Sequence, residues 1–181
     1  VTVPVHLAPL SWTTFQLLEG KAPHHDGLFQ NGVIDTPFVT LSIDDGLTLY
    51  DKTTNEAYED FLRFEDRGDI GNEYIYFQPK GTEPIYAELT AYEVLENNAR
   101  YAKILLKHDL TIPVSADEQL DAEQRGIIEF MNRKASRSEE LTTIPLETEM
   151  TIFVDDPQIR FKTRFTNTAK DHRIRLLVKT H

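Results

Sequence analysis

Cysteine is absent from the 181 residues of the chain. Without it the chain can form neither a disulfide framework nor a zinc site with thiolate ligands. The same absence fits a reducing compartment, so we expect a cytoplasmic protein. No run of apolar residues reaches the length of about 20 that a membrane helix needs, so no membrane association is expected.

Positive charge is also scarce in this chain. It has 30 Asp and Glu residues against 19 Lys and Arg residues, which gives a formal net charge of -11. A chain of this sign repels a phosphate backbone, so we expect no binding to nucleic acid. The apolar share of 40% is ordinary for a globular protein, and the length suffices for one large core or two small ones.

Motifs of metal-dependent and nucleophilic catalysis are missing as well. Of the six histidines, only His24 and His25 are close in sequence, and no HExxH spacing is present. No GxSxG motif places a serine nucleophile on a strand-to-helix turn. We therefore expect no catalytic residue, no metal site and no cofactor in this segment.

What the chain does contain is a series of β-strand patterns. Residues 38–52 predict a hairpin, because apolar residues alternate on both sides of the tight-turn dipeptide Asp45-Gly46. Residues 12–18 are rich in β-formers, and further strands are predicted over residues 74–77, 85–95, 100–112, 143–154, 158–167 and 172–180. These patterns predict a mostly β protein, an antiparallel β-sandwich with one short helical excursion.

The helical excursion is expected to begin near Ser115, which forms a capping box with Glu118. Gly126 weakens the pattern further along. Four apolar residues fall roughly on one helical face, namely Leu120, Ile127, Ile128 and Met131.

The last two strand patterns alternate plainly, which predicts two half-buried antiparallel strands that pair with each other. Four residues are expected to contribute to the core, namely Phe161, Phe165, Ile174 and Leu176. Five cations on the other face are expected to face water and some of the surplus carboxylates, namely Arg160, Lys162, Arg164, Arg173 and Arg175.

Residues 64–78, FEDRGDIGNEYIYFQ, form an acidic, glycine-broken stretch directly before three aromatic residues. Its carboxylates are Glu65, Asp66, Asp69 and Glu73. Their spacing does not match an EF-hand. A catalytic carboxylate pair and a sugar-binding rim remain open, and tyrosine offers a sugar both a stacking face and a hydroxyl. On composition alone, a solvated acidic turn is favoured.

The two ends suggest a piece cut from a longer protein. The chain begins VTVPVHL without methionine and stops at HRIRLLVKTH inside a strand pattern. The stretch 19–27, EGKAPHHDG, is the best linker candidate because of its Gly and Pro residues.

Three stretches resemble bacterial α-mannosidases of glycoside hydrolase family 38, in their C-terminal β-domain region. Residues 47–79, LTLYDKTTNEAYEDFLRFEDRGDIGNEYIYFQP, are similar to the family's acidic loop and its flanks, although Asn72 stands where the family often has Asp. Residues 165–180, FTNTAKDHRIRLLVKT, and the lead-in 8–17, APLSWTTFQL, are similar too. The matching loop positions are Asp66, Gly68, Asp69, Gly71, Glu73, Tyr74, Tyr76 and Pro79.

The resemblance implies a truncated super-sandwich similar to galactose mutarotase. Residues 1–20 would be the end of a small β or linker domain, and residues 21–181 the N-terminal part of the large β-sandwich domain. The parent would be a retaining α-mannosidase whose catalytic groups and divalent metal, zinc in most members, lie in an N-terminal barrel outside this chain.

The resemblance also implies a role for the acidic loop, which in family members points toward the mouth of the active site. Tyr74 is then the expected contact to the mannose hydroxyls, with Tyr76 as the second choice. Asp69 and Glu73, with Asp66, would brace the loop or line the sugar rim. The implied partners are an α-mannoside and the protein's own barrel domain. The alternatives are a stand-alone carbohydrate-binding β-sandwich module and a structural domain without ligand.

Overall fold

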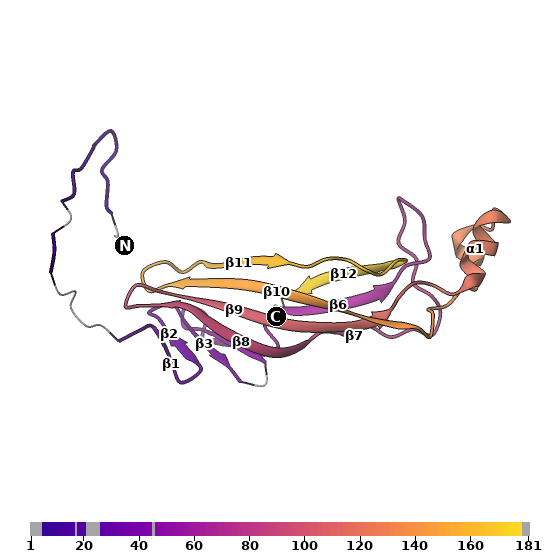
Figure 1. Cartoon of the computed structure of the whole chain (residues 1–181), viewed down its shortest axis with the longest axis horizontal. Coiled ribbons are helices and arrows are strands. Elements are labelled where there is room, and N and C mark those ends of the chain that lie inside the picture. The colour runs from indigo at the N-terminus through magenta and orange to yellow at the C-terminus, as the bar shows by residue number, and fades with distance from the viewer. Residues whose placement is uncertain (1–4, 17, 21–25, 45, 179–181) are drawn as a thin grey trace.

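The computed structural model describes residues 5–16, 18–20, 26–44 and 46–178. In these ranges the chain is mostly β, with three antiparallel sheets, one α-helix and one short 3-10 helix, which confirms the predicted class (Figure 1). Residues 5–16 and 18–20 are exposed and contain no strand, so the strand expected near residues 12–18 is wrong for its described part. His24, His25 and Asp45 lie outside the described residues.

The first sheet confirms the predicted hairpin. Ile43 pairs with Leu47 across the turn, and alternate residues of both strands are buried, as two-residue periodicity requires. The strand order is β1-β2-β3-β4-β5. The strands are β1 (Phe29–Gln30), β2 (Val33–Asp35), β3 (Val39–Ile43), β4 (Leu47–Asp51) and β5 (Glu56–Tyr58).

The second sheet contains the long strands and packs on the first. Its order is β11-β10-β9-β8, and the buried face of β9 and β10 joins the first sheet in one apolar cluster that includes Leu41, Ile104 and Met150. This sheet-on-sheet packing is the sandwich that the patterns predict. The strands are β8 (Glu88–Asn97), β9 (Tyr101–Pro113), β10 (Leu141–Phe153) and β11 (Ile159–Arg164).

The third sheet has the order β12-β6-β7 and packs on the far half of β9 and β10, around Phe64, Leu110 and Ile144. Its strands are β6 (Arg63–Gly68), β7 (Ile85–Tyr86) and β12 (His172–Leu177). The predicted strand 85–95 is therefore divided at Ala87 between two sheets.

The predicted pairing of the last two strands is wrong, because β11 pairs with β10 whereas β12 pairs with β6. Phe161 and Ile174 pack against the core as expected. Phe165 and Leu176 do not, with 47% and 43% of their surface exposed. Phe165 follows the end of β11, and both strands are edges of their sheets, so neither side chain is covered from both sides.

The helix α1 (Glu118–Arg125) is capped by Asp117, whose carboxylate accepts a hydrogen bond of 3.2 Å from the N–H of Gln119. The capping box expected at Ser115 is wrong, because the Ser115 hydroxyl donates to the carbonyl of Ala116. The expected apolar face is wrong as well. The helix stops before Gly126, and of the four residues expected on that face only Leu120 is buried.

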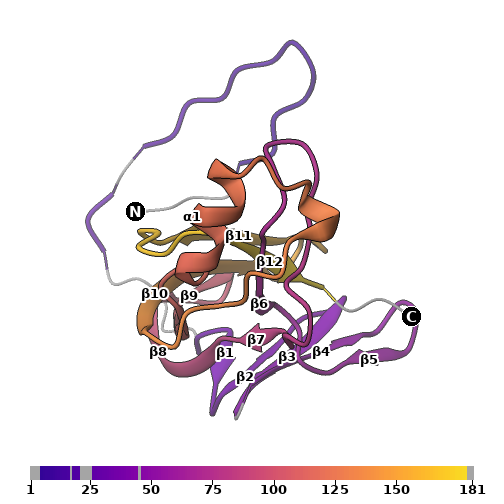
Figure 2. The same cartoon turned by 90° about the vertical axis from the view of Figure 1, so that its right-hand side faces the viewer.

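The chain after α1 leaves the helical path at Ile127, which has a φ of 55° and is 89% exposed. The 3-10 helix η1 (Phe130–Asn132) follows. In the ranges given above, neither helix is long and apolar enough to cross a membrane. Figure 1 shows α1 at one end of the sheets, and Figure 2 looks onto that end, where α1 lies beside the loop that follows β6.

Candidate functional site

The acidic stretch divides into a buried strand and a projecting loop. Residues 63–68 form β6, the central strand of the third sheet, and residues 69–78 leave its end as a loop. The solvated acidic turn favoured by composition is therefore wrong for Glu65 and Asp66, which are 2% and 0% exposed. The strand expected at residues 74–77 is wrong too, because these residues form no strand and the chain turns back there, with the N–H of Asn72 donating to the carbonyl of Ile75.

The backbone of the loop is fixed by two polar side chains. The Asp69 carboxylate accepts hydrogen bonds from the N–H groups of Gly71, at 2.9 Å, and Phe77, at 3.1 Å. The Asn72 side-chain oxygen accepts from the N–H groups of Tyr74, at 3.0 Å, and Ile75, at 2.9 Å. These bonds hold both sides of the turn, so the loop has a defined shape although it projects from the sheet.

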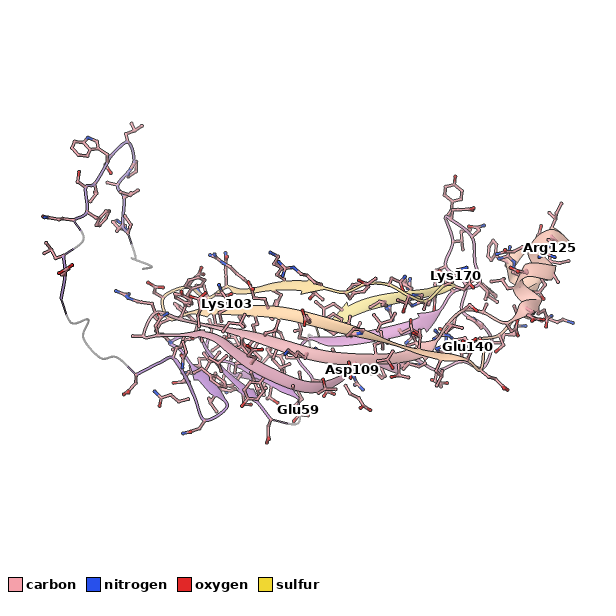
Figure 3. All side chains as sticks on the ribbon, in the orientation of Figure 1. Glu59, Lys103, Asp109, Arg125, Glu140 and Lys170 are labelled. Atoms are coloured by element: carbon pink, nitrogen blue, oxygen red, sulfur yellow. The ribbon has the colours of Figure 1, made fainter. Side chains whose placement is uncertain are left out.

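The tip of the loop presents Tyr74 to solvent, with 93% of its surface exposed. Figure 3 shows the side chains of this loop where it projects from the sheets, near the helix that carries Arg125. Glu73, the neighbour of Tyr74, is exposed as well. Tyr76 differs from both: the guanidinium of Arg173 lies 3.7 Å above its ring, and its hydroxyl lies 3.1 Å from the side-chain oxygen of Gln78. The two tyrosines therefore do not share one face, and only Tyr74 is free to meet a large ligand.

Beneath the loop, the buried Asp66 carboxylate holds three segments together. One oxygen accepts a hydrogen bond from the Arg137 guanidinium, and the other lies 2.6 Å from Nδ1 of His172. His172 Nε2 lies 2.9 Å from the side-chain oxygen of Asn167. Asp66 thus ties β6 to the chain that follows α1 and to the start of β12.

Its neighbour Glu65 is bound by two arginines. Hydrogen bonds from Arg67, at 2.9 and 3.3 Å, and from Arg175 hold the pKa of the Glu65 carboxyl down at about 2. Arg175 therefore faces one of the surplus carboxylates, as expected. Arg173 instead covers the ring of Tyr76, so the expectation is wrong for this residue. On β11 it holds, because Arg160, Lys162 and Arg164 are exposed.

The loop is also held from the side of α1. Arg133 Nη1 donates to the carbonyls of Ile70, at 2.5 Å, and Gly71, at 2.6 Å. The rings of Phe77 and Phe130 lie 5.7 Å apart in an edge-to-face arrangement. Between the loop and the chain after α1 lies an open hollow of about 600 Å³, lined in part by Glu73, Ile127 and Met131.

Comparisons with known proteins identify the kind of segment this is. No family model matches the chain. An α-mannosidase from Enterococcus faecalis V583 is 35% identical with a TM-score of 0.81, over 87% of this chain and 19% of its own. A second structure, a glycosyl hydrolase family 38 protein from Enterococcus faecalis, has the same identity and TM-score over 87% of this chain and 20% of its own.

A curated relative points the same way. A protein from Halalkalibacterium halodurans, provisionally named mannosylglycerate hydrolase, is 37% identical over 135 residues, which are 72% of this chain and 15% of the relative. The chain is a segment of a glycoside hydrolase family 38 protein. This confirms the resemblance found in the sequence, and the chain spans only 15 to 20% of the length of these relatives.

The family 38 segment shows no metal centre in its described part, where no group of three or more His, Asp or Glu side chains is placed to hold an ion. The carboxylates of Glu65, Asp66 and Asp69 instead contact arginines, a histidine and backbone N–H groups. The substrate-binding roles of Tyr74, Tyr76, Asp69 and Glu73 remain predictions.

Sequence reasoning missed the arginines that support the loop. Arg133 and Arg137 lie in the stretch FMNRKASRSEE, which has no pattern that marks a site. Asp66 and Arg137 are 71 residues apart in sequence, and Asp66 and His172 are 106 apart. Asp66 and His172 both lie in stretches that resemble family 38, residues 47–79 and 165–180. That shared resemblance was the one sequence signal that could have indicated a contact between them.

Proposed function

We propose that this segment works within a longer family 38 enzyme that hydrolyses α-mannosides, and that its loop 69–78 forms part of the wall of the sugar site. The observation that carries the proposal is the exposed ring of Tyr74 at the tip of a loop whose backbone is fixed by Asp69, Asn72 and Arg133. An aromatic ring on an ordered loop can stack on a sugar and donate its hydroxyl without a large loss of conformational entropy.

In this proposal the other loop residues support Tyr74 rather than react. Asp69 fixes the turn through Gly71 and Phe77, and Glu73 lies at the rim beside the hollow next to α1. The catalytic carboxylates of a retaining glycosidase, a divalent metal such as zinc, and the barrel that holds them would lie outside this chain. Within the cell we place the enzyme in the cytoplasm.

The substrate class follows from the names of two relatives. One is an α-mannosidase and the other is provisionally a mannosylglycerate hydrolase, so a mannose ring is common to both. We therefore propose that the substrate carries a terminal mannose in α linkage. A comparison of hydrolysis rates for aryl mannosides and for mannosylglycerate would identify the group on the other side of the cleaved bond.

The test is Tyr74→Phe in the longer enzyme, with kcat/KM for an aryl α-mannoside and Tm as the readouts. Loss of one uncharged hydrogen bond costs about 0.5–1.5 kcal/mol, so kcat/KM should fall by about tenfold at most while Tm stays constant, because the exposed ring is retained. Tyr50→Phe is the matched control, since it removes a hydroxyl that contacts Asn55 in the first sheet. An unchanged kcat/KM in Tyr74→Phe would overturn the assignment.

The alternative, a carbohydrate-binding module without enzymatic activity, rests on the same exposed Tyr74. It differs in that the chain alone would bind mannosides tightly. Calorimetric titration of the chain with a mannose oligosaccharide separates the two, because a wall that is only one side of a site offers too few contacts for strong binding.

A further inference from the structure

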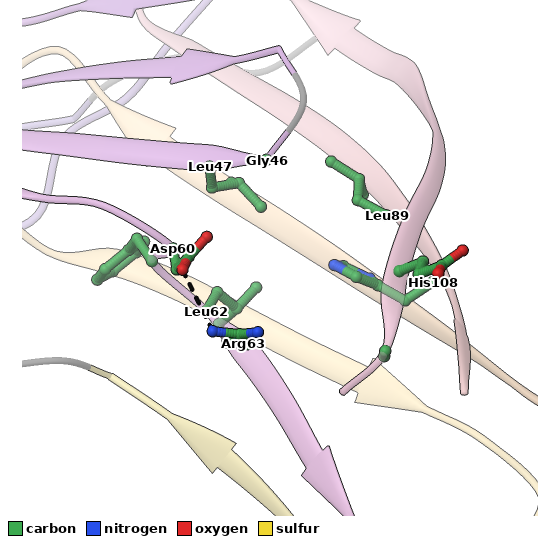
Figure 4. A pocket seen from close by; sticks show the side chains of 10 residues that line it. Gly46, Leu47, Asp60, Leu62, Arg63, Leu89 and His108 are labelled. Atoms are coloured by element: carbon green, nitrogen blue, oxygen red, sulfur yellow. Dashed lines mark hydrogen bonds and ion pairs between the residues drawn. The ribbon is translucent and has the colours of Figure 1, made fainter. Parts of the chain in front are cut away.

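A small pocket lies away from the loop, where the first and third sheets meet on the second (Figure 4). Its volume is about 250 Å³. The side chains that matter are Leu47, Asp60, Leu62, Arg63, Leu89 and His108. They come from β4, from the segment that leads into β6, and from the paired strands β8 and β9.

His108 is a polar residue in an apolar position. It points to the same face of β9 as Leu106 and Leu110, so it lies between the two apolar clusters under the first and third sheets. It is 3% exposed, and its Nδ1 is buried without a hydrogen-bond partner among the described residues. The His108 ring packs edge-to-face on Phe64, with centroids 5.3 Å apart, but its Nδ1 gains no hydrogen bond among the described residues, which is costly for a buried polar atom.

The opposite end of the pocket is polar and open. Asp60 and Arg63 form an ion pair of 3.3 Å, and both side chains reach solvent. The Arg63 guanidinium also lies 3.6 Å above the ring of Tyr86, which fixes its position. In Figure 4 the imidazole of His108 points toward the space between Leu62 and Leu89, with the ion pair at the other side of that space.

The backbone around the pocket is irregular. Leu62 is 1% exposed and has a φ of 66°, a left-handed conformation that leucine rarely adopts. The ladder between β8 and β9 shifts register between Leu89 and Ala91, next to His108. Strained residues and β-bulges are frequent at ligand sites, because they aim side chains that a regular ladder would direct elsewhere.

We propose that this pocket binds a single neutral polyhydroxylated ring, a monosaccharide, between the leucine walls, with Asp60 and Arg63 bonding its hydroxyls at the mouth and His108 at the floor. The leucines suit the apolar face of a sugar ring, and the convergent polar groups suit its hydroxyls. A volume below the range of about 300–1,000 Å³ for drug-sized ligands limits the ligand to one ring.

The charges of the pocket favour a neutral ligand. Burial lowers the pKa of His108 to about 4, so the imidazole is uncharged at neutral pH. Glu88 and Asp60 outnumber Arg63 among the lining residues, which disfavours an anion, and the guanidinium at the mouth disfavours a cation.

This site is separate from the one proposed above. Arg63 and the loop lie at opposite ends of β6, about 17 Å apart at 3.3 Å per residue. The two proposals therefore fail independently, since Tyr74 has no part in this pocket.

The experiment is a titration of the chain with D-mannose, D-glucose, methyl α-D-mannopyranoside and glycerol, followed by the NMR signals of the His108 imidazole. The expected result is a saturable shift with the ring sugars at millimolar concentration and none with glycerol. A response to D-mannose but not to the methyl glycoside identifies a free monosaccharide, and equal responses identify the end of a longer glycan. No shift at 100 mM of any ring sugar overturns the proposal.

Two variants make the assignment specific. Arg63→Gln should weaken binding at least tenfold, whereas Arg125→Gln, which removes a similar exposed ion pair on α1, should have no effect. His108→Asn retains a polar atom near the position of Nδ1 and should bind better than His108→Phe. If the histidine variants fail to fold, the arginine pair decides, and equal affinity in Arg63→Gln and Arg125→Gln contradicts the proposal.

Discussion

Asp66 Oδ1 lies 2.6 Å from Nδ1 of His172, across the ladder that joins β6 to β12. The other Asp66 oxygen binds Arg137, so a fully buried carboxylate joins three segments that are distant in sequence. The loop that carries Tyr74 leaves β6 directly after this residue pair. Asp69, at the base of the loop, donates its N–H to the carbonyl of Asp171, the neighbour of His172. The position of the loop thus depends on the buried contacts below it.

Neutralising Asp66 should be strongly destabilising. Nε and Nη2 of Arg137 already lack partners in the described part of the chain, so Asp66→Asn leaves the buried guanidinium uncompensated. Breaking such a pair from one side costs about 3–5 kcal/mol, measured here as the free energy of unfolding in urea. Asp121→Asn, which breaks an exposed pair with Arg125, should cost about 0–1 kcal/mol. If Asp66→Asn loses as little free energy of unfolding as this control, the contacts of Asp66 with Arg137 and His172 contribute little to stability.

Glu65 should make stability dependent on pH in the acid range. Its pKa is about 2 in the folded chain and about 4.5 when unfolded, so the unfolded state binds more protons between these values. The stabilisation, about 3 kcal/mol from a difference of 2.5 pH units, is complete above pH 4.5 and is lost as the pH falls toward 2. The free energies of unfolding of the chain and of Glu65→Gln should therefore differ at pH 7 and become equal near pH 2. A constant difference across this range contradicts the assignment.

Gly71 should be intolerant of any side chain. A Cβ at this position would lie 1.8 Å from the carbonyl oxygen of Ile75, so Gly71→Ala must open the turn. The Phe77 N–H that donates to Asp69 should then exchange with solvent at least tenfold faster, as measured by hydrogen exchange. Gly46→Ala is the control, because nothing lies within 4 Å of a Cβ there. Unchanged exchange at Phe77 would show that the turn adapts by another route.

The chain alone should not hydrolyse α-mannosides. The sequence lacks a nucleophile motif, and the described residues hold no group of three or more His, Asp or Glu side chains that could bind zinc. Incubation with an aryl α-mannoside and zinc, with release of the aryl alcohol as the readout, should give the uncatalysed rate. Turnover that persists through repurification, and is absent from a mock purification, would contradict the proposal that the catalytic groups lie outside this chain.

The strands could be predicted because their determinants are local. Alternation and the dipeptide at residues 45 and 46 predict the hairpin that β3 and β4 form, and the long strands β9 and β10 follow from the same periodicity. The glycines and Asn72 marked a break within residues 64–78, but the loop was predicted to end at a strand over residues 74–77, which the structure places in the loop. The precise start of α1 was not, because Ser115 and Asp117 are both good caps and only the fold selects between them.

The burial of Glu65 and Asp66 could not be predicted from residue type, because carboxylates are rarely buried unless they are paired. Their partners are far away: Arg175 is 110 residues from Glu65, and His172 is 106 from Asp66. Composition therefore favoured a solvated turn, whereas in the structure the long-range partners of Glu65 and Asp66 keep both carboxylates buried. For the same reason, nothing local to His108 marks it as the buried histidine of a pocket.

The outer strand β8 has a consequence for how copies of the chain behave in concentrated solution. It forms one edge of its sheet and exposes Tyr92, Val94 and Leu95, so its unpaired backbone could template a further strand. Its three glutamates, Glu88, Glu93 and Glu96, lie along the same strand. Glu93 and Glu96 pair with Lys107 and Lys103 of β9, so it is the net negative charge of the whole chain that opposes the approach of two such edges. Acidification toward the isoelectric point of about 4.9 weakens this repulsion, so colloidal stability should fail there before the fold does.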